Sequence, residues 1–415
     1  MSATQKTFAR NFLVLFTGNS AAQLIPFLLA PLVARIFSPE ELGVQENFLA
    51  LVSMIAIVAA GRYDLAIVLP KEHSQAIRLF RLGLLLTLIV SGITLLAGLF
   101  PQWINHFYNN NQLSAYTWWI ACGVFLLSLH SLSNNWSTRM EHYKLISAGR
   151  MVQSLVQNAG YLLLGYAGWG VLGLIIAWLL GLLFPVILLL VPAFGKLRSS
   201  EVSNQKMWAL AREYKDFPLV NSLHAFTDIF ASQVLIYWLI TKNYGLVALG
   251  LFAITSRYLR APLNLISSAI SQLYYKDISK VYGDHTQQSA IFNRSLKLAF
   301  YFMTPPLLLV LLAGPWLFAT YLGTAWAESG EIAQIMVPAI FFNFMASVVS
   351  TTPIVFQRQK TAYGLNLIGY TTGLGLLFIG TFLEWPFQTA LLAYSIAQAI
   401  YYLSLLVWYK NLINN

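Results

Sequence analysis

Arg62 and Asp64 are the residues of this sequence whose placement points most directly to chemistry. They stand two residues apart in the segment 61–70, near the end of an apolar run that begins near Val44. Ionisable side chains at membrane depth are costly, and they persist mainly where they face a watery cavity or a charged partner. We therefore expect the chain to enclose such a cavity, with Arg62 in its lining.

The geometry of a regular helix separates these two side chains. Residues two positions apart point to nearly opposite faces, so Arg62 and Asp64 form no simple ion pair unless Gly61 breaks the helix. We expect one of them to face the cavity and the other to face neighbouring helices or the cytoplasm.

Other polar residues recur at the three- and four-residue spacing that places side chains on one helix face. The segments that carry them are expected to line the same central cavity. The candidate residues are Arg257, Arg260, Asn264, Ser268 and Ser271; Asn221, His224, Asp228 and Ser232; Asn19 and Gln23; and Arg150, Gln153 and Gln157.

Each of these groups also has a purely structural interpretation. Arg257 and Arg260 fit the end of a shorter span, where long basic side chains reach the head groups, and Pro262 fits a helix break there. Asp228 fits a structural hydrogen-bonding role, His224 fits a packed histidine, and the amide side chains fit contacts between helices. The sequence leaves both interpretations open.

The motifs that are absent exclude several classes of protein. The sequence has no metal-ligand spacing, no phosphate-binding loop, no nucleophile elbow and no dinucleotide fingerprint, so we expect neither a cofactor nor a catalytic residue. Cys122 is the only cysteine, which excludes disulfides within the chain and cysteine-based metal sites. The net charge of +10 is explained by basic loops on one side of a membrane rather than by nucleic acid.

Composition predicts an all-α integral membrane protein. Of the 415 residues, 58% are hydrophobic and 10% are charged, whereas soluble domains carry roughly 25% charged residues. A helix crosses the hydrocarbon core with about 20 apolar residues, and unpaired backbone groups are not tolerated there. The long apolar runs lack the alternation of an outer-membrane barrel.

Twelve membrane-spanning helices are expected. The alternate loops hold nearly all of the lysines and arginines, and the opposite set holds only Arg35 and Lys242, which predicts both termini in the cytoplasm. The predicted spans are about 10–34, 44–69, 77–100, 114–135, 146–166, 170–192, 217–241, 245–272, 295–317, 331–356, 361–383 and 387–409.

Two six-helix lobes are expected, comprising residues 1–195 and 217–415, joined by a basic cytoplasmic linker at 196–216. The halves are weakly repeated: the turn 141–144 matches the turn 357–360, 216 residues later, and the segment at 38 matches the segment at 245. Six spans per lobe give both lobes one orientation, so a pseudo-twofold axis would run along the membrane normal, as in transporters whose substrate binds between the halves.

The segments 61–71 and 35–43, together with twelve spans in two lobes, resemble the Wzx-type polysaccharide transporters of the multidrug/oligosaccharidyl-lipid/polysaccharide (MOP) superfamily. This resemblance implies a MATE-like fold and a flippase in the bacterial inner membrane. It implies transport of an undecaprenyl-pyrophosphate-linked oligosaccharide, such as an O-antigen unit, to the periplasmic leaflet. It also implies a cavity with arginines, a role that falls here on Arg62, Arg257 and Arg260, with Arg35 at the periplasmic mouth.

The physical chemistry agrees with the resemblance. Guanidinium groups bind phosphate oxygens through two parallel hydrogen bonds, and Asn264, Asn19 and Gln23 suit a sugar head group. Asp64, Asp228 and His224 are the candidates for balancing charge or coupling to an ion. The driving force is left open between a proton, a sodium ion and the membrane potential.

Two alternative functions fit the sequence less well. A MATE-like efflux pump for cationic drugs requires a cavity dominated by carboxylates, whereas the deep charges here are mainly positive. A membrane O-antigen polymerase or ligase requires a large periplasmic loop, and the longest candidate, 314–331, is short and has no basic residue.

Overall fold

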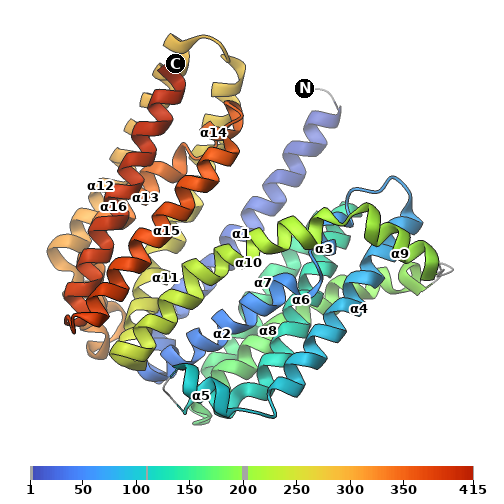
Figure 1. The fold of residues 1–415 in the computed structure, drawn as a ribbon, viewed down its shortest axis with the longest axis horizontal. Helices are drawn as coiled ribbons and strands as arrows, with labels where there is room; N and C mark the ends of the chain where they lie inside the picture. The colour runs from blue at the N-terminus through green and yellow to red at the C-terminus, as the bar shows by residue number, and fades with distance from the viewer. Residues whose placement is uncertain (1–2, 109–110, 199–203, 415) are drawn as a thin grey trace. The chain divides into compact units, whose positions relative to one another are not determined.

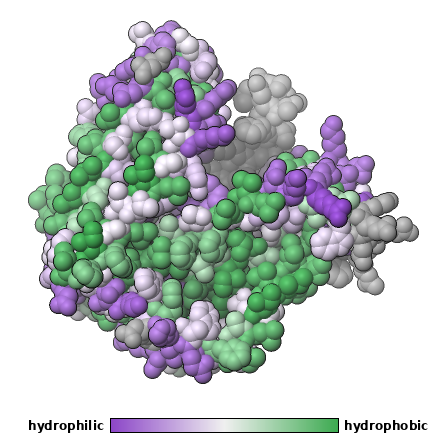
Figure 2. Space-filling model, in the orientation of Figure 1, coloured by the Kyte–Doolittle hydropathy of each residue, from purple (hydrophilic) through white to green (hydrophobic). Residues whose placement is uncertain are grey.

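The computed structural model describes residues 3–108, 111–198 and 204–414, which contain helices and no strand. The chain divides into two compact units, which are Met1–Trp238 and Leu239–Asn415. The predicted division into lobes at a linker of residues 196–216 stays a prediction. Figure 1 shows the helices, and Figure 2 shows hydrophobic side chains covering much of the visible surface, with hydrophilic ones gathered at helix ends.

The first unit contains ten α-helices, a short 3₁₀ turn and two π-helical turns within its described residues. They are α1 (Ala3–Ile36), α2 (Pro39–Ala59), α3 (Tyr63–Ala66), α4 (His73–Ala97), α5 (Gln102–Tyr108), η1 (Leu113–Tyr116), α6 (Thr117–Arg139), α7 (Tyr143–Tyr166), α8 (Gly170–Arg198), α9 (Asn204–Glu213), η2 (Phe217–Asn221), α10 (Ser222–Ile229), η3 (Phe230–Val234) and the start of α11 (Leu235–Lys280). Helix α7 packs between α1 and α8, and α6 packs against α2, α4 and α8.

Helix α2 begins where local sequence dictates but ends earlier than predicted. Its start is a capping box, in which the Ser38 hydroxyl accepts from the Glu41 backbone N–H and the Glu41 carboxylate accepts from the Ser38 backbone N–H, followed by Pro39. Its end is at Ala59, because Gly61 and Arg62 have positive φ angles of 58° and 55°. The predicted span 44–69 is therefore wrong at its C-terminal end.

The second unit is built from the remainder of α11 and five further α-helices in its described residues. They are α12 (His285–Leu322), η4 (Thr324–Trp326), α13 (Ala327–Val348), α14 (Thr352–Val355), α15 (Gln359–Phe382) and α16 (Phe387–Asn414). Helix α13 packs against α12 and α16, and α15 packs against α16. Close packing of α12 on α13 depends on glycine, because a Cβ on Gly330 would overlap the backbone of Gly314.

Nine helical segments in the described part of the chain are long and apolar enough to cross a membrane. One of them, Phe217–Lys280, has 64 residues and is broken at Gly245, whose φ is 86°. This segment is long enough for two membrane crossings, one on each side of the break. Helix α7, with its polar residues, and α1 supply further helical segments at predicted spans. These bounds are compatible with the twelve predicted spans.

The expected internal repeat is supported by two pairs of turns. Glu141 in the first unit and Gln357 in the second both have left-handed backbone, and in each turn the next N–H donates to a carbonyl five residues back. Gly168 and Glu384 form a second pair with the same hydrogen-bond pattern. Both pairs are 216 residues apart, as are the two ends of α7 and α15. This pattern pairs some of the carbonyls that the end of a helix leaves without a partner.

Candidate functional site

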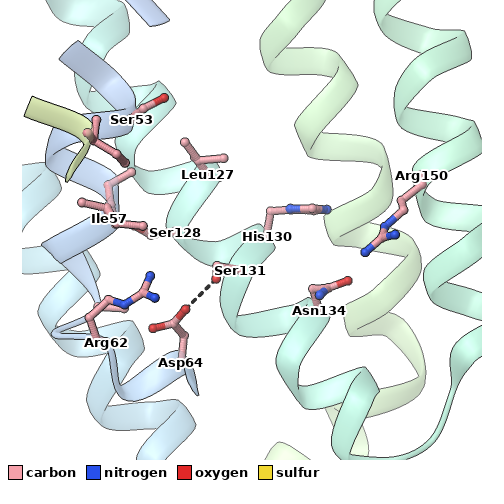
Figure 3. A pocket seen from close by; sticks show the side chains of 13 residues that line it. Ser53, Ile57, Arg62, Asp64, Leu127, Ser128, His130, Ser131, Asn134 and Arg150 are labelled. Atoms are coloured by element: carbon pink, nitrogen blue, oxygen red, sulfur yellow. Dashed lines mark hydrogen bonds between the residues drawn. The ribbon is translucent and has the colours of Figure 1, made fainter. Parts of the chain in front are cut away.

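A cavity of about 360 Å³ lies within the first unit, beside the break that follows α2 (Figure 3). Its walls come from α2, the turn after it, α6, α7 and the end of α10, which packs against α2. The lining residues are Ser53, Ala56, Ile57, Ala60, Arg62, Asp64, Leu127, Ser128, His130, Ser131, Asn134, Arg150 and Ile229. The volume falls within the range typical of small-molecule sites.

The turn at Gly61 and Arg62 directs two charged side chains into this cavity. A Cβ on Gly61 would lie 3.1 Å from Leu86 Cδ1 and 3.2 Å from the Tyr63 ring, at a positive φ that side chains disfavour. Because the turn breaks the helix, Arg62 and Asp64 both line the cavity. The expectation that they point to opposite sides is wrong for this reason.

Asp64 is held by α6 and retains unused hydrogen-bonding capacity. It is 3% exposed, and its Oδ2 accepts a hydrogen bond of 2.6 Å from the Ser131 hydroxyl. Its Oδ1 and the Nε of Arg62 are buried, and within the described residues neither has a hydrogen-bond partner. Buried groups of this kind are expensive unless a ligand or water pairs with them, so both are available to a bound molecule.

The other wall carries His130 and Asn134 of α6 and Arg150 of α7. Figure 3 shows the Arg150 guanidinium directed toward the His130 ring and the Asn134 amide, across the cavity from Arg62 and Asp64. His130 and Asn134 are four residues apart, one turn along the same helix face. With His130 neutral, the two arginines and one aspartate that line the cavity give it a net positive charge.

The sequence prediction missed part of this site. The sequence prediction includes Arg150 as a member of a polar stripe but omits His130, Ser131 and Asn134. The run 128–135 holds six polar residues in an otherwise apolar span, and their three- and four-residue spacing was the signal available. What the spacing could not show is that this face meets the turn after α2.

Neither Arg35 nor Gln23, two of the predicted residues of α1, lines this cavity. Arg35 and Gln23 are exposed, and the side chain of Asn19 lies outside the described residues. Arg35 precedes the first turn of α2 and Arg62 follows its last, so about 30 Å of helix separates them.

His224 and Asp228 occupy one exposed face of α10, four residues apart. Neither lines the cavity, to which the helix end contributes Ile229. Their role in coupling or charge balance stays a prediction.

Arg257, Arg260 and Asn264 belong to the second unit and share an exposed face of α11. Arg260 lies near the tyrosines Tyr394 and Tyr402 of α16. The polar stripe expected from the sequence is therefore a real surface of that helix. Its joint action with Arg62 stays a prediction.

The chemistry available in the cavity is non-covalent binding of an anion. Guanidinium and amide groups are hydrogen-bond donors, and arginine forks match phosphate and carboxylate geometry. The Ser128 and Ser131 hydroxyls already donate to the Ala56 carbonyl and to Asp64. Among the described residues no group of three or more His, Cys, Asp or Glu side chains could hold a metal ion.

Comparisons with known proteins agree with the fold. The sequence model of a family described as polysaccharide biosynthesis protein matches residues 32–331, whereas no curated protein matches. An inward-facing MATE-family multidrug transporter of the MOP superfamily aligns with a TM-score of 0.73 at 15% identity, over 96% of this chain and 94% of that one. The lipid II flippase MurJ, in an inward closed conformation, aligns with a TM-score of 0.70 at 16% identity, over 97% and 90%.

A MOP-superfamily transporter from Pyrococcus furiosus, described as having a binding pocket of reverse polarity, aligns with a TM-score of 0.53 at 14% identity, over 97% of this chain and 93% of that one. At these identities the likeness shows the fold alone. The chain is thus an all-α integral membrane protein with a MATE-like fold, as predicted, and its fold is also similar to that of MurJ.

Proposed function

The chain belongs to the polysaccharide biosynthesis protein family, and from this premise we propose that it is a flippase for lipid-linked oligosaccharides. The proposed cargo is an oligosaccharide on undecaprenyl pyrophosphate, such as an O-antigen unit, moved from the cytoplasmic to the periplasmic leaflet of a bacterial inner membrane. The basic loops support cytoplasmic termini.

The observation that carries this proposal is the pair of arginines facing one cavity from two walls. A diphosphate has two phosphoryl groups with several negatively charged oxygens, and arginine binds such oxygens with two parallel, charge-assisted hydrogen bonds. Arg62 on one wall and Arg150 on the other offer one fork each. Asn134 supplies a neutral amide beside them.

The volume of this cavity limits how much of the proposed substrate it can hold. At about 360 Å³ the cavity suits the diphosphate and the sugar next to it rather than a whole oligosaccharide. The remaining sugars would contact other polar surfaces, for which Arg257, Arg260 and Asn264 of α11 are our candidates, while the polyprenyl tail stays in the bilayer.

Transport would follow alternating access, with the lobes moving about a central site as in other transporters built from repeats. Asp64 is the candidate for charge balance inside the cavity, because it shares the lining with both arginines. Asp228 and His224 on α10 are our candidates for coupling to a proton or sodium ion.

The test is a deletion strain combined with complementation. Loss of the protein should cause a cytoplasm-facing lipid-linked oligosaccharide to accumulate, and the wild-type gene should clear it. Normal delivery of the oligosaccharide in the deletion strain would refute the proposal, and the composition of an accumulated lipid would identify the cargo.

Efflux of cationic drugs is the second candidate, favoured by the structural similarity to a MATE multidrug transporter. It predicts lower drug resistance in the deletion strain with unchanged surface polysaccharide. The cavity disfavours it, because two arginines and one carboxylate repel a cation. A polymerase or ligase is disfavoured by the segment 314–331, in which α12, η4 and α13 follow one another without a separate domain.

A further inference from the structure

Tyr63, the residue between Arg62 and Asp64, is directed into protein rather than into the cavity. It is 5% exposed and belongs to a buried cluster with Ala66, Ile67 and Trp136, whereas it is absent from the cavity lining that holds both its neighbours. The turn therefore presents two charged side chains to the cavity and anchors itself by the tyrosine between them.

The partner of Tyr63 is α9, in the segment between the predicted lobes. The Tyr63 hydroxyl donates a hydrogen bond of 3.1 Å to the backbone carbonyl of Ala211. Ala211 lies in the last turn of α9, where helix carbonyls have no partner within the helix. Tyr63 thus caps α9 at its C-terminal end.

The inner face of α9 reinforces this contact. Met207 and Leu210 are 7% and 4% exposed and belong to the same buried cluster as Tyr63, with Ala211 and Tyr214 packed against it. Helix α9 also packs against α4. The outer face is free of the cluster, because Trp208 and Ala209 are exposed.

The chain that follows Asp64 is held from α6. Arg139 donates to the backbone carbonyl of Ile67 at 3.1 Å and to those of Lys71 and Glu72 at 3.5 and 3.4 Å. Arg139 is also close enough to Tyr214 to act on it electrostatically. The segment 63–72 is therefore clamped between α6 and α9.

Such a clamp is what the backbone of the turn needs. A left-handed arginine is held by its surroundings rather than by its own preference, and strained conformations of this kind persist where packing over-determines them. If α9 detaches, Tyr63 loses its acceptor and part of its packing, and the turn is free to relax toward a conformation that directs Arg62 elsewhere.

We propose that α9 is a positioning element for Arg62 and Asp64, acting through Tyr63, so that docking or release of this cytoplasmic helix switches the anion-binding cavity on or off. The inference rests on the proposed function for its biological meaning. It gives the segment that is predicted to join the lobes a second task beyond connection, because a movement of that segment during transport would change the affinity for the diphosphate.

The experiment measures, without any substrate, whether the positive charge of Arg62 lies in the cavity. In the full-length protein in membrane vesicles, Cys122 is replaced by Ala and the cavity residue Asn134 by Cys. The rates of labelling with an anionic and a neutral methanethiosulfonate reagent are compared. Their ratio reports positive charge at the cavity, whereas a general change of accessibility alters both rates together.

Arg62→Ala sets the scale, with an expected fall of the ratio of roughly two- to five-fold from the loss of one nearby charge. Leu210→Asp, which undocks α9, should produce the same fall, and adding it to Arg62→Ala should lower the ratio no further. Ala209→Asp is the matched control, since it places the same charge on the exposed face of α9 and should leave the ratio at its original value.

Tyr63→Phe keeps the ring and removes only the hydroxyl. It therefore tests the proposal even if the Leu210→Asp protein does not accumulate in the membrane. We expect it to lower the ratio by about two-fold, since a hydrogen bond contributes modestly. An unchanged ratio in Tyr63→Phe, or equal changes in both labelling rates in Leu210→Asp, overturns the proposal. Because no substrate is used, these outcomes are independent of whether the protein is a flippase.

Discussion

Replacing Arg62 by glycine separates its charge from its backbone conformation. Arg62 has a φ of 55°, which costs an L residue about 1–2 kcal/mol and costs glycine almost nothing. Glycine also loses more entropy on folding, by roughly 0.5–1 kcal/mol. The two effects nearly cancel, so we expect Arg62→Gly to unfold within a few degrees of the wild-type midpoint.

The expected loss is in anion affinity. Hydrogen bonds to charged groups contribute about 1.5–3 kcal/mol each. Losing a two-pronged guanidinium contact should therefore cost about 3 kcal/mol, or about 100-fold in the dissociation constant. Arg62→Lys keeps a charge but offers no planar fork, and should lie between the two, about ten-fold weaker than wild type.

The assay is binding of undecaprenyl pyrophosphate to the purified protein in lipid nanodiscs, with undecaprenol as the uncharged comparison. Surface polysaccharide in a complemented deletion strain is the second measurement. Arg35→Gly is the matched control, because it removes an exposed arginine that does not line the cavity and is separated from Arg62 by about 30 Å of helix. Binding by folded Arg62→Gly within two-fold of wild type would refute the assignment of Arg62 to the diphosphate.

Three further predictions concern the cavity and the fold. Arg150→Ala should weaken undecaprenyl pyrophosphate binding by at least ten-fold. Equal binding by wild type and variant would show that Arg150 does not contribute to the diphosphate site. Ser131→Ala removes the hydroxyl that donates to buried Asp64 and should lower stability by about 1–3 kcal/mol; an unchanged thermal midpoint would contradict this. Gly330→Ala forces a methyl group into the backbone of α12 and should lower the midpoint by several degrees, whereas Gly364→Ala, with nothing within 4 Å, should not.

The membrane character and the positions of the helices were predictable because they depend on local properties. An apolar run of about 20 residues favours a spanning helix wherever it occurs, and the charges of the loops fix orientation one loop at a time. The same holds for the start of α2, whose capping box can be read from the four consecutive residues Ser38 to Glu41. The repeated turns at Glu141 and Gln357 were also visible as matching segments.

The end of α2 shows where local reasoning stops. An apolar run continues past Gly61, so periodicity alone extends the helix to residue 69. A single glycine within a helix is tolerated at a cost of about 1 kcal/mol, and the sequence does not say whether it bends the chain. In the structure the cluster around Tyr63 and Trp136 holds the turn, and the break follows from that packing.

By itself the sequence determined that this is a helical membrane protein, it predicted two repeated halves, and it identified Arg62 and Asp64 as unusual. Tertiary structure decided that both residues face one cavity, and that His130 and Arg150, from helices more than 60 residues further along the chain, complete it. The physical reason is that burial and charge are properties of each segment, whereas a cavity exists only where several segments meet.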